Sequence, residues 1–197
     1  MAHCRPALIV AVLAVCAAPI FAANIVQNGS FENPQIGNWF RTVYAGDPFI
    51  TGWTVGLVSV DVTQGDIGQA EDGTQGIDMA GSPGPGSLTQ TLTTESGAGY
   101  MLSFWVSSNG GPYTDALIVD WNGFSLATLS TPAPGTWREY SFEVTGTGSD
   151  TLAFIGTIDG LAGARLDNVS VDPIPEPATL GLIGAGWVLI GFRFRRR

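Results

Sequence analysis

Short segments in which apolar and polar residues alternate dominate residues 24–172. Residues 100–107, for example, carry Tyr, Leu, Phe and Val at every second position, with Met, Ser, Trp and Ser between them. Successive side chains of a β-strand point to opposite faces, so this pattern predicts a strand with one buried face. Gly, Pro, Asn and Asp separate such segments, and none of them has the period of a helix. The sequence therefore predicts an all-β domain.

The expected strands share alternating or β-branched residues and end at turn-forming residues. They are residues 53–62, 76–79, 86–93, 99–107, 116–121, 125–129, 136–145, 151–158 and 164–171. Asn122-Gly123 separates two of them and is the dipeptide typical of a two-residue hairpin. This series of short strands over residues 24–174 predicts a jelly-roll β-sandwich.

The charges of the chain are unevenly distributed. Residues 24–177 hold all 17 acidic residues and only three arginines, which gives this part a net charge of −14. Such a surface repels the phosphates of nucleic acids, so nucleic acid is excluded as a partner.

The distribution of reactive residue types excludes several kinds of chemistry. His3, Cys4 and Cys16 are the only histidine and cysteines, and the chain has no lysine. Once residues 1–23 are removed, Ser–His–Asp and Cys–His catalysis, histidine-bound zinc and disulfides are all excluded.

Residues 1–23 have the order of a secretory signal peptide, which is expected to form a helix. Arg5 precedes an apolar stretch, and small residues follow at Ala22 and Ala23. An uncleaved membrane anchor is the alternative, but the apolar stretch is short for it. The domain that follows is therefore expected outside the cytoplasm.

Residues 175–197 form a second targeting segment. An apolar stretch over residues 178–192 is expected to be a hydrophobic helix, although a membrane span needs about 20 residues. Its basic end is expected on the cytoplasmic side of the membrane. The polar residues that flank the stretch are Pro175, Glu176 and Pro177 before it, and Arg193, Arg195, Arg196 and Arg197 after it.

This tail resembles the PEP-CTERM sorting signal of Gram-negative bacteria. The resemblance implies an inner-membrane precursor that an exosortase recognises and cleaves near Pro-Glu-Pro. It also implies release or attachment at the cell surface, in an exopolysaccharide or biofilm matrix. A plain C-terminal membrane anchor is the alternative, and it has the same topology.

The order of motifs in the middle of the chain resembles galactose-binding-like jelly rolls. These include the carbohydrate-binding modules of xylanases and glucanases, cell-wall-associated domains of unknown function, and the bacterial "choice-of-anchor C" type. The matching motifs are residues 28–32 (Asn-Gly-Ser-Phe-Glu), 52–53, 72–79, 86–92, 100–105, 135–140 and 166–171.

The same resemblance implies one structural Ca²⁺. In the resembled modules, the Asn-Gly-x-Phe-Glu and Asp-Asn-Val segments lie side by side and hold the metal, which makes Glu32 and Asp167 the expected ligands. Ca²⁺ takes 6–8 oxygen ligands, and loop carbonyls supply some of them. The alternative is that Glu32 caps a turn and Asp167 hydrogen-bonds its own backbone.

Four aromatic residues are candidates for binding a sugar, because sugars are recognised by flat apolar rings beside hydrogen-bonding groups. Trp105 points away from Phe104 along its strand, and Trp39 and Tyr44 belong to an expected variable loop over residues 37–48. Tyr113 lies in another loop, over residues 109–114. For each ring, packing in the core or against a loop is the alternative. Trp53 and Trp137 are expected in the core.

These features predict a non-catalytic module that binds polysaccharide in the extracellular matrix. A structural or protein–protein interaction module without a glycan ligand is the alternative. A glycosidase needs two carboxyl groups about 5–9 Å apart across a cleft. Glu139 and Glu143, on one strand, would lie about 13 Å apart.

Overall fold

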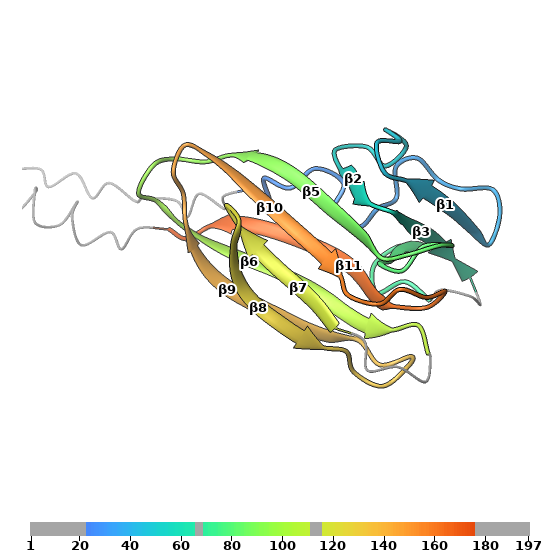
Figure 1. Cartoon of the computed structure of the whole chain (residues 1–197). Helices are drawn as coiled ribbons and strands as arrows, with labels where there is room; N and C mark the ends of the chain where they lie inside the picture. Colours follow the sequence, from blue (N-terminus) through green and yellow to red (C-terminus); the bar gives the residue numbers. More distant parts are fainter. Residues whose placement is uncertain (1–22, 66–68, 111–115, 176–197) are drawn as a thin grey trace, which may run out of the picture.

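The computed structural model describes residues 23–65, 69–110 and 116–175, and in these ranges the chain forms strands and loops without an α-helix. Figure 1 shows the strands arranged in two layers. They are β1 (Phe40–Tyr44), β2 (Thr54–Leu57), β3 (Ser59–Gln64), β4 (Gln75–Asp78), β5 (Gly86–Thr93), β6 (Gly99–Ser108), β7 (Ala116–Trp121), β8 (Phe124–Ser130), β9 (Arg138–Thr145), β10 (Ser149–Gly156) and β11 (Ala164–Pro173).

The two layers are antiparallel sheets. One has six strands in the order β1-β3-β4-β11-β6-β9, and the other has five in the order β2-β5-β10-β7-β8. The connections repeatedly cross from one sheet to the other, as they do in a jelly roll. The predicted all-β sandwich is confirmed.

Aromatic side chains fill the space between the sheets. Phe104 of β6 meets Phe154 of β10 edge to face, with ring centroids 5.0 Å apart. Tyr140 and Phe142 of β9 stack beside Phe104, each at 6.1 Å. Because the apolar residues of β6 face this core, its alternate residues point outward from the six-stranded sheet.

The predicted hairpin at Asn122-Gly123 is confirmed. Both residues have positive φ, 55° and 77°, and the flanking Trp121 and Phe124 are register partners. Positive φ at both central residues is the geometry that favours Asn-Gly in two-residue hairpins.

The prediction of one strand over residues 53–62 is wrong. β2 ends at Leu57, whose φ is 58°, and β3 begins at Ser59 in the other sheet. A left-handed residue cannot continue a strand, so the chain leaves one sheet here and enters the other. The apolar pattern runs on across this break, which conceals it in the sequence.

The prediction of a loop over residues 37–48 is also wrong, because β1 lies inside it and pairs with β3. Val43 is fully buried, whereas Phe40 and Tyr44 are exposed. An edge strand with aromatic residues on its outward face lacks the usual apolar-inward, polar-outward pattern.

The start of the domain lies against its last strand. The amide of Ile25 donates to the carbonyl of Val171 at 3.0 Å, and the amide of Val169 donates to the carbonyl of Gly29 at 3.0 Å. A Cβ at Gly29 would lie 2.0 Å from the carbonyl oxygen of Val169, so only glycine allows this approach. The predicted adjacency of the Asn-Gly-Ser-Phe-Glu and Asp-Asn-Val segments is confirmed.

The predicted signal helix and C-terminal hydrophobic helix lie outside the described residues, apart from a few residues next to the domain. Pro175 is exposed just after β11. Within residues 23–65, 69–110 and 116–175, no helix has the length and apolar character needed to cross a membrane.

Candidate functional site

A row of polar side chains crosses the outer face of the six-stranded sheet. Asp61 of β3 is the register partner of Asp78 of β4, which pairs with Arg165 of β11, which in turn pairs with Ser107 of β6. All four are buried, with exposed fractions of 5%, 1%, 6% and 0% in that order. Their sequence neighbours face the core between the sheets, so these four point to the opposite side. We call these residues the polar row.

Three atoms of the polar row lack a hydrogen-bond partner among the described residues. They are Oδ1 of Asp61, Nη2 of Arg165 and Oγ of Ser107. Most buried polar atoms in proteins are hydrogen-bonded, because burying one unpaired is costly. Three such atoms along one row, unpaired among the described residues, make this face a candidate site.

Asp78 differs from the rest of the row because the protein itself satisfies its carboxylate. Its Oδ1 accepts the amides of Ala80, at 2.9 Å, and Gly163, at 3.0 Å, and its Oδ2 accepts Nδ2 of Asn109. Burial raises the pKa of Asp78 to about 7, and the negative charge of Asp61 adds to this rise, while the three hydrogen bonds oppose it. Asp78 thus holds three separate segments together.

Arg165 is the one basic residue of the polar row. Burial lowers the pKa of its guanidinium, while the charges of Asp78 and Asp167 act in the opposite direction. Its guanidinium carbon lies 5.7 Å from the ring centroid of Trp137. Trp137 is half-buried, and its contact with Arg165 places it on the outer face. The prediction that it belongs to the core is therefore wrong.

A cleft of about 150 Å³ opens over the acidic end of the polar row. Its rim carries the exposed apolar side chains of Phe40, 48% exposed, and Leu161, 74% exposed. The residues that line it are Phe40, Asp61, Thr63, Asp78, Ser82, Asn109 and Leu161. Apolar surface thus lies beside buried carboxylates in one hollow.

Trp105, a predicted ligand residue, lies at the other side of this face. It is half-buried, and its register partners are Asp167 and Glu139. Its predicted orientation, opposite to Phe104, is what the structure shows. Trp105 and Trp137 thus lie toward the β6 and β9 side of the polar row, while Phe40 lies at the β1 side.

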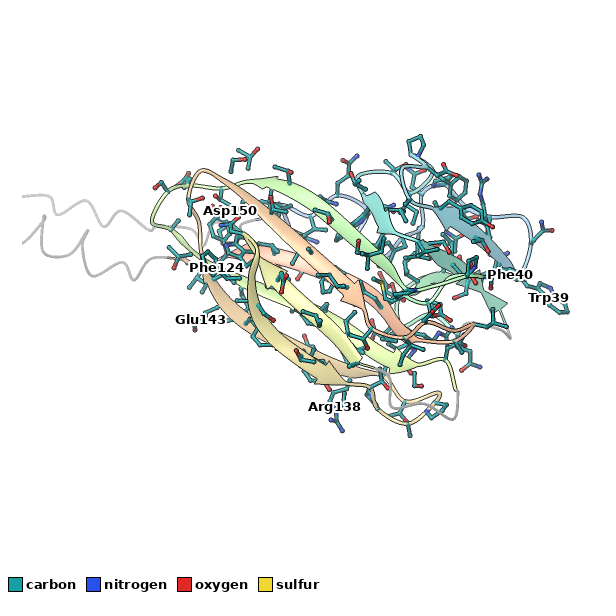
Figure 2. All side chains as sticks on the ribbon, in the orientation of Figure 1. Trp39, Phe40, Phe124, Arg138, Glu143 and Asp150 are labelled. Atoms are coloured by element: carbon teal, nitrogen blue, oxygen red, sulfur yellow. The ribbon has the colours of Figure 1, made fainter. Side chains whose placement is uncertain are left out.

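The other predicted ligand residues lie outside this row. Trp39 is 72% exposed and Tyr44 is 54% exposed. Figure 2 shows Trp39 projecting beyond Phe40 at the end of the molecule. Tyr113 lies outside the described residues. The structure therefore gathers Trp105 near the polar row and places Trp39 and Tyr44 around β1.

Glu32, a predicted metal ligand, closes the loop before β4. Its Oε1 accepts the amides of Thr74, at 2.6 Å, and Gln75, at 2.7 Å, while its Oε2 accepts the hydroxyl of Thr74 at 2.7 Å and Nε2 of Gln35 at 3.2 Å. Burial acts to raise the pKa of Glu32, but these hydrogen bonds outweigh it and lower the pKa.

Asp167, the other predicted ligand, holds the same loop. Its Oδ2 accepts the amides of Glu71, at 2.7 Å, and Asp72, at 3.0 Å, and its Oδ1 accepts the amide of Asn168 at 2.7 Å. Burial raises the pKa of Asp167 to about 7; the charge of Asp72 adds to this, and the amide hydrogen bonds oppose it.

The carboxylates of Glu32 and Asp167 are both bound by the protein itself. All four of their oxygens accept hydrogen bonds from the protein, and three of these oxygens accept backbone amides. Within the part of the chain that the structure describes, no three Asp, Glu, His or Cys side chains are grouped to hold a metal. Calcium binding at Glu32 and Asp167 stays a prediction.

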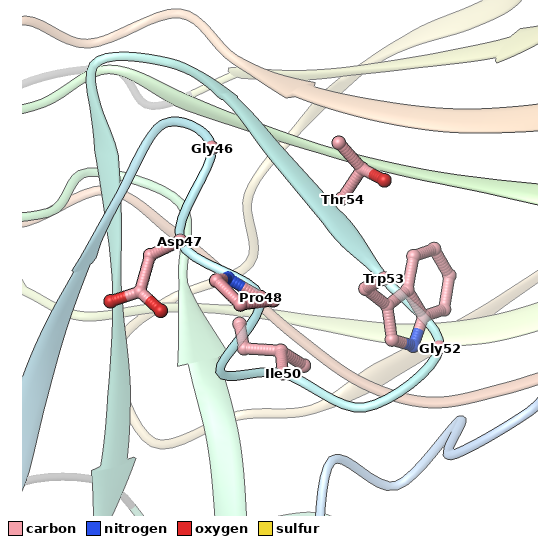
Figure 3. Close-up of a pocket in the computed structure, with 7 residues that line it drawn as sticks. All are labelled: Gly46, Asp47, Pro48, Ile50, Gly52, Trp53 and Thr54. Carbon is pink, nitrogen blue, oxygen red and sulfur yellow. The ribbon is translucent and has the colours of Figure 1, made fainter.

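A second hollow, of about 270 Å³, lies beside the start of β2 and is lined by Gly46, Asp47, Pro48, Ile50, Gly52, Trp53 and Thr54. Figure 3 shows Asp47 and Trp53 on opposite sides of it, with Pro48 and Ile50 between them. Trp53 is only 4% exposed, and its ring packs against Phe31 at 5.5 Å, as predicted for a core residue. Among the described residues that line this hollow, the aromatic ring is therefore almost fully buried.

Sequence reasoning missed the polar row. Each acidic member is embedded in an apolar strand: Asp61 lies between Val60 and Val62, and Asp78 lies between Ile77 and Met79. A charged residue in such a strand is a usable signal, because charged side chains are rarely buried without a partner or a role. The pairing of distant strands, which aligns the row, cannot be read from these local patterns.

A family match covers nearly the whole β-domain. The family described as "Protein of unknown function (DUF642)" matches residues 24–171. The chain belongs to the DUF642 family. This DUF642 protein also matches the PEP-CTERM protein-sorting motif over residues 173–197, which confirms the resemblance of the tail. The motif implies an exported protein with a C-terminal anchor before processing.

This DUF642 protein matches a curated relative that is much longer, and solved structures are similar to it at low sequence identity. Halomucin of Haloquadratum walsbyi is 35% identical over 170 residues, which cover 79% of this chain but 2% of halomucin. A family 35 carbohydrate-binding module from Clostridium thermocellum is 15% identical, with 66% of this chain and 97% of that chain covered and a TM-score of 0.46. The CBM22-1 xylan-binding domain from Paenibacillus barcinonensis is 16% identical, with 68% and 91% covered and a TM-score of 0.47.

Proposed function

We propose that this protein is exported and binds a polysaccharide, without catalysis, on the outer face of its six-stranded sheet. The observation that carries this proposal is the polar row, in which Asp61, Arg165 and Ser107 have buried side-chain atoms without a hydrogen-bond partner among the described residues. Apolar side chains flank the row, with Phe40 on one side and Trp105 on the other. Sugar sites combine such apolar surfaces with a few placed polar groups.

The location proposed for this activity is the cell surface or extracellular matrix of a Gram-negative bacterium. The sorting motif over residues 173–197 supports this location, because it implies export and a C-terminal anchor. An exosortase is the processing partner that we propose. The net charge of −14 over residues 24–177 argues against nucleic acid as a partner.

The absence of catalysis is proposed from the state of the carboxylates. A glycosidase uses one carboxyl group as an acid and a second as a base or nucleophile. In the cleft, Asp78 accepts three hydrogen bonds from the protein, and Asp61 holds an oxygen that lacks a donor among the residues that the structure describes. One open carboxylate oxygen suits the recognition of a hydroxyl group better than two-carboxylate chemistry.

A protein–protein interaction module is the second candidate. It is favoured by exposed apolar side chains that lie outside the cleft, namely Trp39, Tyr44, Leu57 and Val58. They surround β1, an edge strand with one open side, and edge strands are common places for another chain to pair.

Affinity electrophoresis of residues 24–174 tests the proposal. This segment contains every strand and the whole described core, and gels containing different polysaccharides report binding by slower migration. We expect retardation by at least one polymer and a loss of it in Trp105→Ala. Phe124→Ala is the matched control, because it removes an aromatic side chain that is 78% exposed on the five-stranded sheet. Free migration in every gel would favour the interaction module.

A further inference from the structure

We infer that the cleft over β3 and β4 selects an uncharged sugar residue, one hydroxyl group of which donates a hydrogen bond to Oδ1 of Asp61. This inference rests on the proposed binding of polysaccharide. The cleft then determines which sugar residue binds, and the hydrogen bond to Asp61 is the contact that discriminates between sugars.

Asp61 has one carboxylate oxygen that can still accept a hydrogen bond. Its Oδ2 accepts the hydroxyl of Ser82 at 3.2 Å, whereas its Oδ1 has no donor among the residues that the structure describes. The side chain is only 5% exposed and lines the cleft. A carboxylate only accepts hydrogen bonds, so the group that completes it must be a donor such as a hydroxyl.

The second step concerns the charge around this oxygen. Asp78 on β4 is its register partner, and Arg165 on β11 is the next in the row. The other polar groups that line the cleft, on Ser82, Asn109 and Thr63, are neutral. A carboxylate on a sugar would be placed beside the negative charge of Asp61 in a poorly solvated hollow, where like charges repel strongly. Uronic acids are therefore disfavoured.

Cations are disfavoured by the same arrangement. Arg165 contributes one positive charge to the row, and the carboxylate of Asp78 is already bound by Ala80, Asn109 and Gly163. Asp61 therefore stands as a single open carboxylate next to a compensated pair. This is too little negative charge for a dedicated cation site, and it suits a neutral donor.

The third step concerns the rim. The ring of Phe40 is half-exposed and Leu161 is mostly exposed, so both offer apolar surface at the mouth of the cleft. The C–H groups of a sugar pack against such a surface, while its hydroxyl groups point toward polar partners. Phe40 and Asp61 can thus contact the apolar face and the hydroxyl edge of one sugar residue.

The experiment compares Asp61→Ala with Asp120→Ala in residues 24–174. Asp120 is the matched control because it lies in β7 of the other sheet and its Oδ1 also lacks a partner among the described residues. Affinity gels at pH 8 would contain neutral xylan, galactan or glucomannan, and the polyuronates alginate and polygalacturonate. Thermal unfolding would show whether each variant is folded.

We expect the unsubstituted protein to bind at least one neutral polymer and neither polyuronate. Asp61→Ala should weaken this binding about tenfold or more, as the loss of a hydrogen bond to a charged group would, and Asp120→Ala should leave it unchanged. If Asp61→Ala fails to fold, Phe40→Ala takes its place, with the same weakening expected.

Two kinds of result would overturn the inference while the proposed function stands. One is unchanged binding by Asp61→Ala with binding lost in Trp105→Ala, and the other is a preference for a polyuronate. If no polymer retards the unsubstituted protein, the proposed function itself is refuted, and the inference falls with it.

Discussion

Stability of this domain should decrease as the pH rises from about 4 to 7, and Asp78 should cause a large part of the decrease. Its pKa is about 7 in the folded protein, against an ordinary value of 3.8. The folded state therefore holds a proton in this window that the unfolded chain has released. A group of this kind contributes stability below its unfolded pKa and loses it as the pH passes its folded pKa.

The size of the effect follows from the shift. One pKa unit corresponds to 1.36 kcal/mol, so a difference of about three units is worth about 4 kcal/mol over the whole window. Between pH 5 and pH 7, Asp78 should account for about 2 kcal/mol of the free energy of unfolding. Asp167, with a similar pKa, adds a second contribution of the same sign.

Urea unfolding of residues 24–174 at several pH values measures this directly. In Asp78→Asn the amide cannot titrate. The decrease in the free energy of unfolding between pH 5 and pH 7 should therefore be about half as large, because the contribution of Asp167 remains. Glu139→Gln, which changes an exposed carboxylate on the same sheet, is the control and should keep the full decrease. A free energy of unfolding that stays level or rises over this range, or an equal decrease in Asp78→Asn, would refute the argument.

Three further predictions concern other parts of the chain. Burial acts to raise the pKa of Asp150, but hydrogen bonds from Thr94, Asn122 and Thr147 outweigh it and lower the pKa to about 2. Stability should therefore fall as the pH drops from about 4 to 2, and in urea unfolding Asp150→Ala should lower the free energy of unfolding by roughly 2–4 kcal/mol. If one Ca²⁺ binds at Glu32 and Asp167, a chelator should lower the melting temperature, since a ligand at one hundred times its Kd adds about 2.7 kcal/mol to the free energy of unfolding. A melting temperature that neither the chelator nor added calcium changes would refute the prediction of a calcium site. Deletion of residues 175–197 should leave the domain unprocessed in the periplasm or medium, and an unchanged surface fraction in cell fractionation would contradict the sorting role.

Much of the fold could be predicted because its signals are local. Alternation identified most strands to within a few residues, and Asn122-Gly123 identified the β7–β8 hairpin. The contact between the start of the domain and β11 was predicted from a resemblance. Gly29 explains it physically, because any side chain there would meet the carbonyl of Val169.

The parts that could not be predicted depend on contacts between distant segments. Leu57 adopts a conformation that its residue type disfavours, so nothing local marks the change of sheet. Asp61, Asp78 and Arg165 are 17 and 87 positions apart along the chain, and only the order β3-β4-β11 makes them neighbours. The candidate site forms when these strands pair, and the separations of its residues along the chain follow no pattern that could be recognised in the sequence.

The course of β11 also sets how the candidate site would be presented on an anchored protein. Arg165 lies near the start of this strand, and Pro173, where the sorting motif begins, is its last residue. Pro173 lies eight positions after Arg165, which corresponds to about 27 Å along an extended strand. A tether at Pro173 would hold that end of the sandwich close to the membrane and turn the cleft outward, so that a polymer could reach it without first approaching the lipid surface.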